Sequence, residues 1–192
     1  MGEYAALVLS EALKLEDALR LIAQRAQLMV TRCTPAKTGM VAVKLSADDA
    51  RVELAQLFGT PAPLTVACEN SPEDCVVAGD IDHLSTFLGH CKAVGIKALK
   101  LQVTFGFHSP TMEPAVNPYR ELCSDIKMSE GRIPILSSHL GRFARLEDLS
   151  VDFLPSHMRR PVRFSDAIRT LESVTVGRKM RFLEIGHTSG SE

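Results

Sequence analysis

The sequence predicts a mixed α/β fold, and two observations lead to that class. Stretches of helical period alternate with short apolar runs of strand period along the 192 residues. Between residues 40 and 105 the order is strand, helix, strand, strand, helix, strand, which is typical of the ferredoxin-like arrangement. We therefore expect residues 40–105 to form a compact subdomain, inserted between residues 1–39 and 106–192 of a larger unit.

Residues 1–39 are expected to form two helices, Gly2 to Ala12 and Glu16 to Cys33. Apolar residues of the second helix fall on one stripe, and Arg25 lies within that stripe. A guanidinium on a buried face is unfavourable unless it meets an anion. Two partners are open: an Asp or Glu in an internal salt bridge, which periodicity alone favours, or the carboxylate of a substrate, which Arg suits better than Lys.

The elements of residues 40–105 follow from apolar runs and from capping residues. Ser46 is expected to cap a helix that ends at Phe58, and Asp80 a helix that ends at Val94 before Gly95. The predicted strands are residues 40–45, 64–68, 75–79 and 96–103, with a turn at residues 70–74.

The stretch Phe-Gly-Phe-His-Ser-Pro at residues 105–110 follows the last of these strands. Gly106 is expected to allow a sharp bend, and Pro110 to open a helix that runs to Ile126. His108 is then held on a turn at the end of a strand, between aromatic rings. By itself such a histidine is more often a structural hydrogen-bonding group than a functional one.

The remaining chain is expected to alternate again. We predict strands at residues 133–137 and 181–185, helices at residues 153–158 and 164–171, and no regular structure at residues 187–192.

Composition excludes several classes of protein. Apolar residues make up 45% of the chain and the net charge is -1, which indicates a globular protein without a nucleic-acid surface. No apolar run reaches membrane-spanning length. The five cysteines form no Cys-x-x-Cys pair, so we expect reduced cysteines, a cytoplasmic location and no metal site.

Short motifs occur in an order that resembles that of one enzyme family. Gly-Glu-Tyr-Ala-Ala-Leu at residues 2–7 resembles the second half of Gly-His-Ser-x-Gly-Glu-Tyr-Ala-Ala-Leu, the nucleophile elbow of malonyl-CoA:acyl-carrier-protein transacylases. Arg25 falls at the spacing of that family's substrate-binding arginine, and Phe-His-Ser at residues 107–109 matches its catalytic histidine motif. Further matches are Asn-Ser-Pro at 70–72, Arg-Ile-Pro-Ile at 132–135 and Leu-Glu-Ile-Gly at 183–186. The sequences of these motifs most resemble those of the acyltransferase domains of fungal iterative polyketide synthases.

The resemblance implies a fold and a two-step acyl transfer. Residues 1–39 and 106–192 would be part of an α/β-hydrolase-like core, and the ferredoxin-like subdomain would form one wall of the substrate cleft. A serine takes the malonyl group from malonyl-CoA, and the phosphopantetheine thiol of an acyl carrier protein collects it. The chain itself would bind no cofactor or metal, and its partners would be malonyl-CoA, the carrier protein and the rest of a multidomain synthase in polyketide or fatty acid synthesis.

The resemblance also assigns roles to individual residues. His108 would be the general base and then the general acid, and Arg25 would hold the malonyl carboxylate. Phe107 matches the bulky residue associated with malonyl rather than methylmalonyl, and Asn70 lies in the small-subdomain segment assigned to substrate binding.

The sequence departs from the family pattern at the nucleophile. The serine should come one residue before Met1, and no other serine replaces it by motif. We therefore expect this chain to be inactive by itself. Two alternatives remain open: a non-catalytic carrier-protein interaction module or pseudoenzyme remnant, and a free-standing ferredoxin-like ligand-binding protein that uses only residues 40–105.

Overall fold

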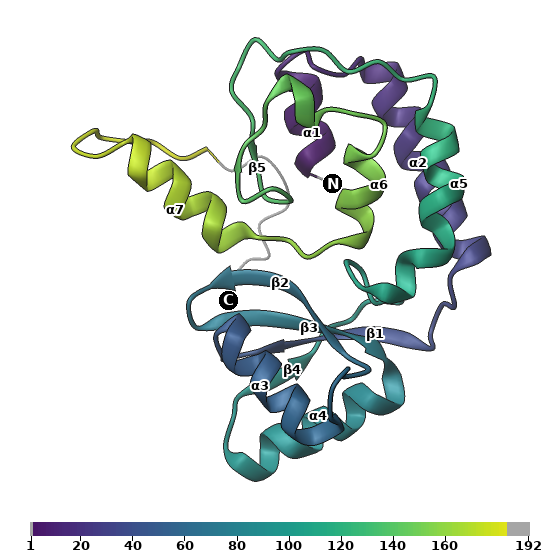
Figure 1. Cartoon of the computed structure of the whole chain (residues 1–192), viewed down its shortest axis with the longest axis vertical. Helices are drawn as coiled ribbons and strands as arrows, with labels where there is room; N and C mark the ends of the chain where they lie inside the picture. Colours follow the sequence, from purple (N-terminus) through teal and green to yellow (C-terminus); the bar gives the residue numbers. More distant parts are fainter. Residues whose placement is uncertain (1, 184–192) are drawn as a thin grey trace.

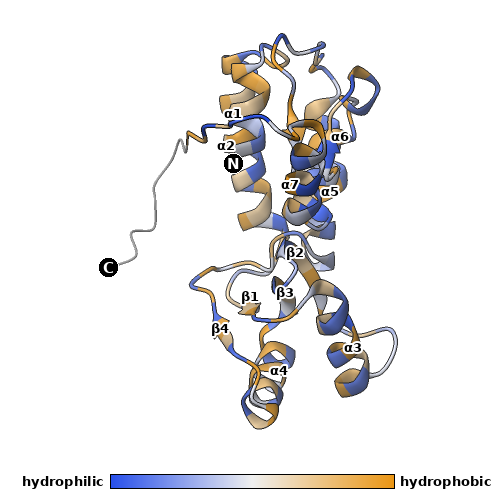
Figure 2. Ribbon diagram, turned by 90° about the vertical axis from the view of Figure 1, so that its left-hand side faces the viewer, coloured by the Kyte–Doolittle hydropathy of each residue, from blue (hydrophilic) through white to orange (hydrophobic). Residues whose placement is uncertain are grey.

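The chain folds into two parts that lie one above the other along its long axis (Figure 1). The structure is a computed structural model and describes residues 2–183. We call residues 38–100 the small subdomain and residues 2–32 with 105–183 the large part. The small subdomain contains a four-stranded sheet, whereas the large part is mainly helical. Figure 2 shows the same two parts after a quarter turn, with the helices of the large part above the sheet.

The small subdomain has the predicted element order. Its elements are β1 (Thr38–Val43), α3 (Ala47–Phe58), β2 (Thr65–Ser71), β3 (Asp74–Asp80), α4 (Ile81–Val94) and β4 (Ala98–Lys100). The sheet order is β2-β3-β1-β4, and all neighbouring strands are antiparallel. The sheet face that α3 and α4 cover carries the main core, which includes Val41, Val43, Leu54, Val77, Leu84 and Phe87.

The two helices of the small subdomain begin and end where their capping residues predict. Ser46 Oγ accepts a hydrogen bond from the Asp49 N–H at 3.0 Å, and Asp80 Oδ1 accepts one from the Asp82 N–H at 2.9 Å. These bonds satisfy amide groups that a helix start leaves without partners. Gly95 ends α4 in the left-handed region, with φ of 80°.

The large part packs its helices around one apolar core. Its elements are α1 (Gly2–Leu9), α2 (Leu15–Arg32), η1 (Pro110–Met112), α5 (Glu113–Cys123), β5 (Leu136–Ser137), β6 (Arg142–Phe143), η2 (Leu146–Asp148), α6 (Phe153–Arg159) and α7 (Phe164–Val174). The core includes Tyr4, Leu7, Leu21, Met112, Tyr119 and Leu154.

Two contacts join the large part to the small subdomain. Val162 lies along the free edge of β2, donating to Ala67 O and accepting from the Glu69 N–H, both at 2.8 Å. Phe107 packs against the core of the large part and also against the sheet face opposite α3 and α4. The loop that carries His108 is therefore anchored to both parts.

Several predicted elements are shorter in the structure. The strand expected at residues 96–103 is β4, only Ala98–Lys100, because the chain beyond it makes single hydrogen bonds to residues 36 and 40 instead of a continuous ladder. The strand expected at residues 133–137 is reduced to β5, which pairs only with β6. The predicted helix from Pro110 to Ile126 is a 3₁₀ turn followed by α5, which ends at Cys123.

The structure also corrects the elements predicted near the two ends of the chain. The first helix ends at Leu9 instead of Ala12. Residues 181–183 form no strand, and the rest of the strand predicted at residues 181–185, like residues 187–192, lies outside the described residues.

Each of the five cysteines is free. Within residues 2–183, no helix combines the length and the apolar character needed to cross a bilayer.

Candidate active site

His108 lies on a tight loop between β4 and η1. Its φ is 57°, an uncommon left-handed conformation for a residue with a side chain. The loop is closed by two hydroxyls that donate to Gly106 O, Ser109 Oγ at 2.6 Å and Thr111 Oγ1 at 2.8 Å. The strain at His108 is thus held by fixed hydrogen bonds, which is a frequent arrangement at functional sites.

Gly106 has a different role from the predicted one. A Cβ atom at this position would lie 2.9 Å from Thr111 Oγ1 and 3.3 Å from Gly39 O. The glycine is therefore needed for the close approach of the loop to β1, whereas the left-handed residue is His108.

The surroundings of the His108 imidazole fix its tautomer. Nδ1 lies 2.9 Å from His157 O and 3.2 Å from Arg160 O. Carbonyl oxygens only accept, so Nδ1 carries the proton and donates it, which leaves a lone pair on Nε2. Burial lowers the pKa of His108, although these two hydrogen bonds act in the opposite direction. The ring is therefore neutral near pH 7, and Nε2 can accept a proton.

Three imidazoles form what we call the histidine cluster: His108, His139 and His157. The His157 ring lies edge-on to His108 at 5.5 Å and to His139 at 6.0 Å between centroids. His157 is buried, and burial followed by the charge on His108 lowers its pKa well below the usual value. The His157 ring is therefore uncharged and packs against the His108 imidazole.

Arg25 reaches the same region from α2. Its Cζ lies 5.2 Å from the centroid of the Tyr4 ring, which is a cation–π distance. Tyr4 OH is hydrogen-bonded to Tyr119 OH at 2.6 Å, and the Tyr4 ring lies edge-on to His157 at 6.3 Å. Burial has the largest effect on the pKa of His108, followed by its backbone hydrogen bonds. The positive charge of Arg25 comes next and lowers this pKa further. The structure thus brings Arg25 and His108 to one region, with Tyr4 and His157 between them.

Phe107 and Asn70 lie in different surroundings. Phe107 is half-buried beside His108, with its ring 5.8 Å from that of Phe105. Asn70 is exposed at the end of β2, and its Nδ2 donates to Asp74 Oδ1 at 3.1 Å across the hairpin. The contacts of the described residues place Phe107 at the histidine loop and Asn70 away from it.

Sequence reasoning missed Tyr4, His139 and His157 as site residues. Tyr4 was part of a matched motif, but the sequence gives no sign that its ring would contact Arg25. His139 and His157 reach His108 only through tertiary contacts, across a hairpin and a helix that are far from residue 108 in sequence. No local pattern identifies such a cluster.

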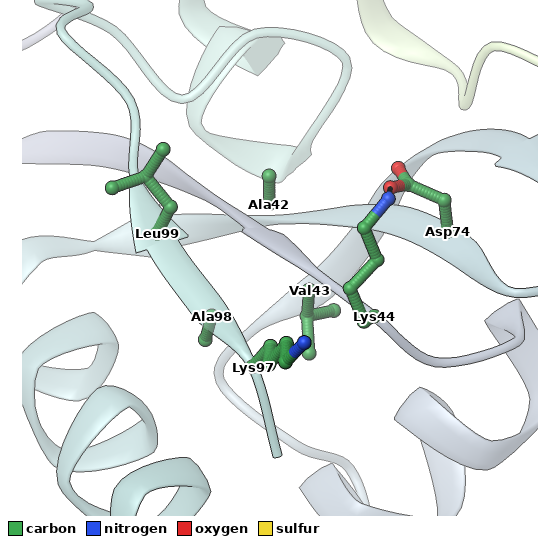
Figure 3. Close-up of a pocket in the computed structure, with 7 residues that line it drawn as sticks. All are labelled: Ala42, Val43, Lys44, Asp74, Lys97, Ala98 and Leu99. Atoms are coloured by element: carbon green, nitrogen blue, oxygen red, sulfur yellow. Dashed lines mark hydrogen bonds and ion pairs between the residues drawn. The ribbon is translucent and has the colours of Figure 1, made fainter.

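A separate hollow of about 330 Å³ lies on the small subdomain (Figure 3). Strands β1 and β4 and the start of β3 line it, and the Lys44 ammonium is paired with the Asp74 carboxylate at its side. It includes none of the four residues predicted for the site. Among residues 2–183, no group of His, Cys, Asp and Glu side chains is arranged to hold a metal ion.

The chain is similar to known proteins over most of its length. A family model described as "Acyl transferase domain" matches residues 1–186. The chain is 35% identical over 175 residues to Orsellinic acid synthase ArmB of Armillaria ostoyae, and 34% identical over 187 residues to Bikaverin polyketide synthase bik1 of Gibberella fujikuroi. These matches cover 89% and 97% of this chain but only 8% and 9% of the relatives.

Solved structures are similar over most of the chain. The acyltransferase domain from the second module of the salinomycin polyketide synthase matches with a TM-score of 0.81 and 32% identity, over 90% of this chain and 39% of that one. The malonyl CoA-acyl carrier protein transacylase from Clostridium perfringens matches with a TM-score of 0.82 and 26% identity, over 90% of this chain and 55% of that one. The chain therefore belongs to the acyl transferase domain family, as its ordered motifs predict.

Proposed function

We propose that this chain is part of an acyltransferase that moves a malonyl group from coenzyme A to an acyl carrier protein within a polyketide synthase. The observation that carries the proposal is the position of His108, whose Nδ1–H is held by two backbone carbonyls. Relatives named as polyketide synthases and as a malonyl CoA-acyl carrier protein transacylase support the substrate class.

His108 acts as the proton carrier of the reaction. With Nδ1 fixed as donor, Nε2 takes the proton from a serine hydroxyl as that oxygen attacks the thioester, and returns it to the leaving thiol. The backbone carbonyls of His157 and Arg160 orient the ring and stabilise the imidazolium that forms. This is the part that an orienting carboxylate plays in a serine-histidine-aspartate triad.

Arg25 holds the free carboxylate of the malonyl group. The cation–π contact with Tyr4 positions the guanidinium, and its proximity to His108 places the bound carboxylate near the reacting thioester. Phe107, beside His108, limits the space for a branched acyl group. Asn70 is assigned to substrate binding from the resemblance, and its side-chain hydrogen bond to Asp74 lies within the β2–β3 hairpin.

We also propose that the small subdomain is a ferredoxin-like insertion in a partial α/β-hydrolase-like core. Its element order and the strand order β2-β3-β1-β4 support this assignment. In that arrangement the sheet face opposite α3 and α4 looks toward the histidine loop and forms one wall of the cleft.

The proposal assigns the nucleophile to a serine that would precede Met1. This chain by itself is then expected to bind the substrate without forming an acyl-enzyme. A non-catalytic carrier-protein interaction module is the alternative function. It shares the binding residues, and a covalent malonyl adduct on the isolated chain would contradict the proposed position of the nucleophile.

The test is the affinity of the isolated chain for malonyl-CoA compared with acetyl-CoA, measured by isothermal titration calorimetry. The two ligands differ only by the carboxylate, so their ratio reports the Arg25 contact. We expect malonyl-CoA to bind ~10-fold more tightly or better, because a charge-assisted hydrogen bond contributes roughly 1.5–3 kcal/mol.

Two variants on α2 sharpen this test. Arg25→Gln should remove the preference for malonyl-CoA. Arg20→Gln should keep it, because Arg20 is half-exposed and is paired with Asp17 at 3.3 Å. Equal affinity of the unmodified chain for both thioesters would show that Arg25 does not hold the carboxylate.

A further inference from the structure

A cavity of about 560 Å³ is lined in part by His139 of the histidine cluster. The segment between α6 and α7 supplies Arg160, Pro161 and Arg163 to its lining, and this segment passes along β2 (Figure 1). Its polar lining consists mainly of cationic and imidazole side chains: Arg51, His139, Arg142, Arg160 and Arg163, together with Glu69 and Ser156.

Three of the four arginines in this cavity are already paired with carboxylates. Arg51 is paired with Glu69 and, at 2.7 Å, with Asp48. Arg142 is paired with Asp148 through two hydrogen bonds of 2.7 and 2.8 Å. Arg163 is paired with Asp166 at 2.6 Å. Each of these guanidiniums has a carboxylate partner, although Arg163 shares Asp166 with Arg169.

Arg160 differs from the other three arginines. Its side chain is exposed at the cavity, and it forms no ion pair with any residue between 2 and 183. Its backbone is fixed at both ends, by the bond from its N–H to Ser156 O at 2.8 Å and by the bond from His108 to its carbonyl. The backbone of Arg160 is thus fixed at the cavity, and among the described residues its guanidinium has no carboxylate partner.

His139 supplies a second polar group without a partner. His139 lines the cavity and is 9% exposed, and its Nδ1, which is itself enclosed, has no hydrogen-bond partner within residues 2–183. Burial, and then the charges of Arg160, His108 and Arg163, lower the pKa of His139 to about 4, against a small opposing effect of Asp148. The imidazole is neutral in the empty cavity, and a bound anion would favour its protonation.

We propose that this cavity binds a phosphate group between Arg160 and His139. The free charge of Arg160 and a proton taken up by His139 together balance a dianion. The planar guanidinium can donate two parallel hydrogen bonds to phosphate oxygens. The phosphate could be inorganic or could belong to coenzyme A, and the second source rests on the proposed function.

A dianion bound in the cavity would also change the pKa of His108. The Arg160 carbonyl accepts from His108 Nδ1, and the His139 ring reaches His108 through the His157 ring. A dianion here stabilises the imidazolium, so phosphate binding is expected to raise the pKa of His108.

The first experiment measures binding of inorganic phosphate to the full chain by calorimetry. We expect a dissociation constant of ~1 mM or tighter, and Arg160→Gln should weaken it at least ~10-fold. Arg145→Gln is the matched control, because Arg145 is exposed, pairs with Glu147 at 3.4 Å and lies outside the cavity lining. An equal effect of the two substitutions, or no binding by the unmodified chain, would overturn the proposal. Melting curves verify that both variants fold.

The second experiment tests the part played by His139. Sulfate keeps its charge between pH 7.5 and 5.5, so a change in its affinity reports protonation of the protein. Sulfate should bind more tightly at pH 5.5, and His139→Gln should abolish most of that difference. An undiminished pH dependence in His139→Gln would contradict the role of this residue.

A last comparison identifies the source of the phosphate. Arg160→Gln is tested against malonyl-CoA and against malonyl-pantetheine, which has no phosphate. Weaker binding of malonyl-CoA alone assigns the cavity to coenzyme A, whereas unchanged binding of both, with weaker binding of inorganic phosphate, assigns it to a separate anion. The preference for malonyl over acetyl thioesters depends on Arg25, so failure of this site and failure of the proposed function are distinguishable.

Discussion

The tautomer and the position of individual site residues depend on their neighbours more than on their own chemistry. His108 becomes a proton acceptor at Nε2 because two carbonyls, both from the end of α6, hold Nδ1. Arg25 is positioned by the ring of Tyr4, which in turn is fixed by Tyr119. The sequence proposes His108 and Arg25 as site residues, but the residues that orient them come from segments about 50 and 20 residues away in the chain.

Glu3 offers a test of buried charge at a single residue. The side chain is 8% exposed, and its Oε1 has no hydrogen-bond partner within the described residues. Burial raises the pKa of Glu3 above its usual value of 4.5, in spite of hydrogen bonds from Ser137 and Ser138. A carboxyl with a raised pKa in the folded state favours folding when it is protonated, and this contribution is lost as the pH rises through the folded pKa.

We predict that Glu3→Gln stabilises the chain at pH 8 by roughly 1 kcal/mol or more and gives no such gain at pH 4. Urea denaturation at the two pH values measures the difference. Glu16→Gln is the control, since Glu16 is also in the first turn of a helix but is exposed. The same gain from Glu3→Gln at both pH values would show that its charge is not the cause.

At the scale of elements, capping residues predicted the ends of α3 and α4 better than alternation predicted the ends of strands. Ser46, Asp80 and Gly95 act through hydrogen bonds or backbone angles within a few residues, so the bounds of α3 and α4 follow from the sequence. The strand expected at residues 96–103 had the right alternation, yet β4 ends at Lys100 although β1 continues to Thr38. Among the described residues beyond Lys100, only the Leu101 N–H donates to the backbone of β1, at Met40 O. Where a strand ends depends on how far its hydrogen bonds to the neighbouring strand continue. The alternation of apolar and polar residues within one segment does not indicate this.

The loop between β4 and η1 gives the prediction at this scale. Gly106→Ala would place a Cβ 2.9 Å from Thr111 Oγ1 and 3.3 Å from both Gly39 O and Gly79 N. Two of these contacts are with backbone, which cannot rotate away. We expect a loss of roughly 1–3 kcal/mol in the free energy of unfolding.

Gly89→Ala is the matched control for this substitution. Gly89 lies within α4 and a Cβ there meets nothing within 4 Å, so Ala should stabilise the helix by roughly 0.5–1 kcal/mol. Thermal melts of the two variants should therefore shift in opposite directions. A tolerated Ala at both positions would mean that the loop does not depend on close contact with β1 and β3.

At the scale of the whole molecule, the two parts meet through a small number of contacts near the histidine cluster. The general α/β class and the element order of the small subdomain could be predicted from periodicity and capping residues, and the family from ordered motifs. The cluster itself could not, because His108, His139 and His157 are brought together only when the loop, the β5–β6 hairpin and α6 pack against one another. The same packing makes the stability of the molecule depend on pH.

Burial lowers the pKa of all three histidines, to about 4 for His139. In the unfolded chain they titrate near the ordinary value of 6.5, so between pH 6.5 and about 4 the unfolded state binds more protons than the folded state. The stability that depends on neutral histidines is therefore present above pH 6.5 and is lost as the pH falls through this range. The lowered pKa of Asp148, about 2 because of hydrogen bonds from Arg142 and Arg145, affects stability only at lower pH.

We predict that the free energy of unfolding falls steeply from pH 6.5 to 4.5, and that His139→Gln makes this fall smaller by about 1.4 kcal/mol per pH unit, the equivalent of one proton. Urea denaturation at half-unit pH steps measures both slopes. His83→Gln removes an exposed imidazole from α4 and controls for the loss of a histidine as such. If His139→Gln and His83→Gln change the slope equally, the acid sensitivity does not come from the cluster. A smaller slope in His139→Gln alone would show that the contacts which keep the site histidines neutral also make the fold unstable in acid.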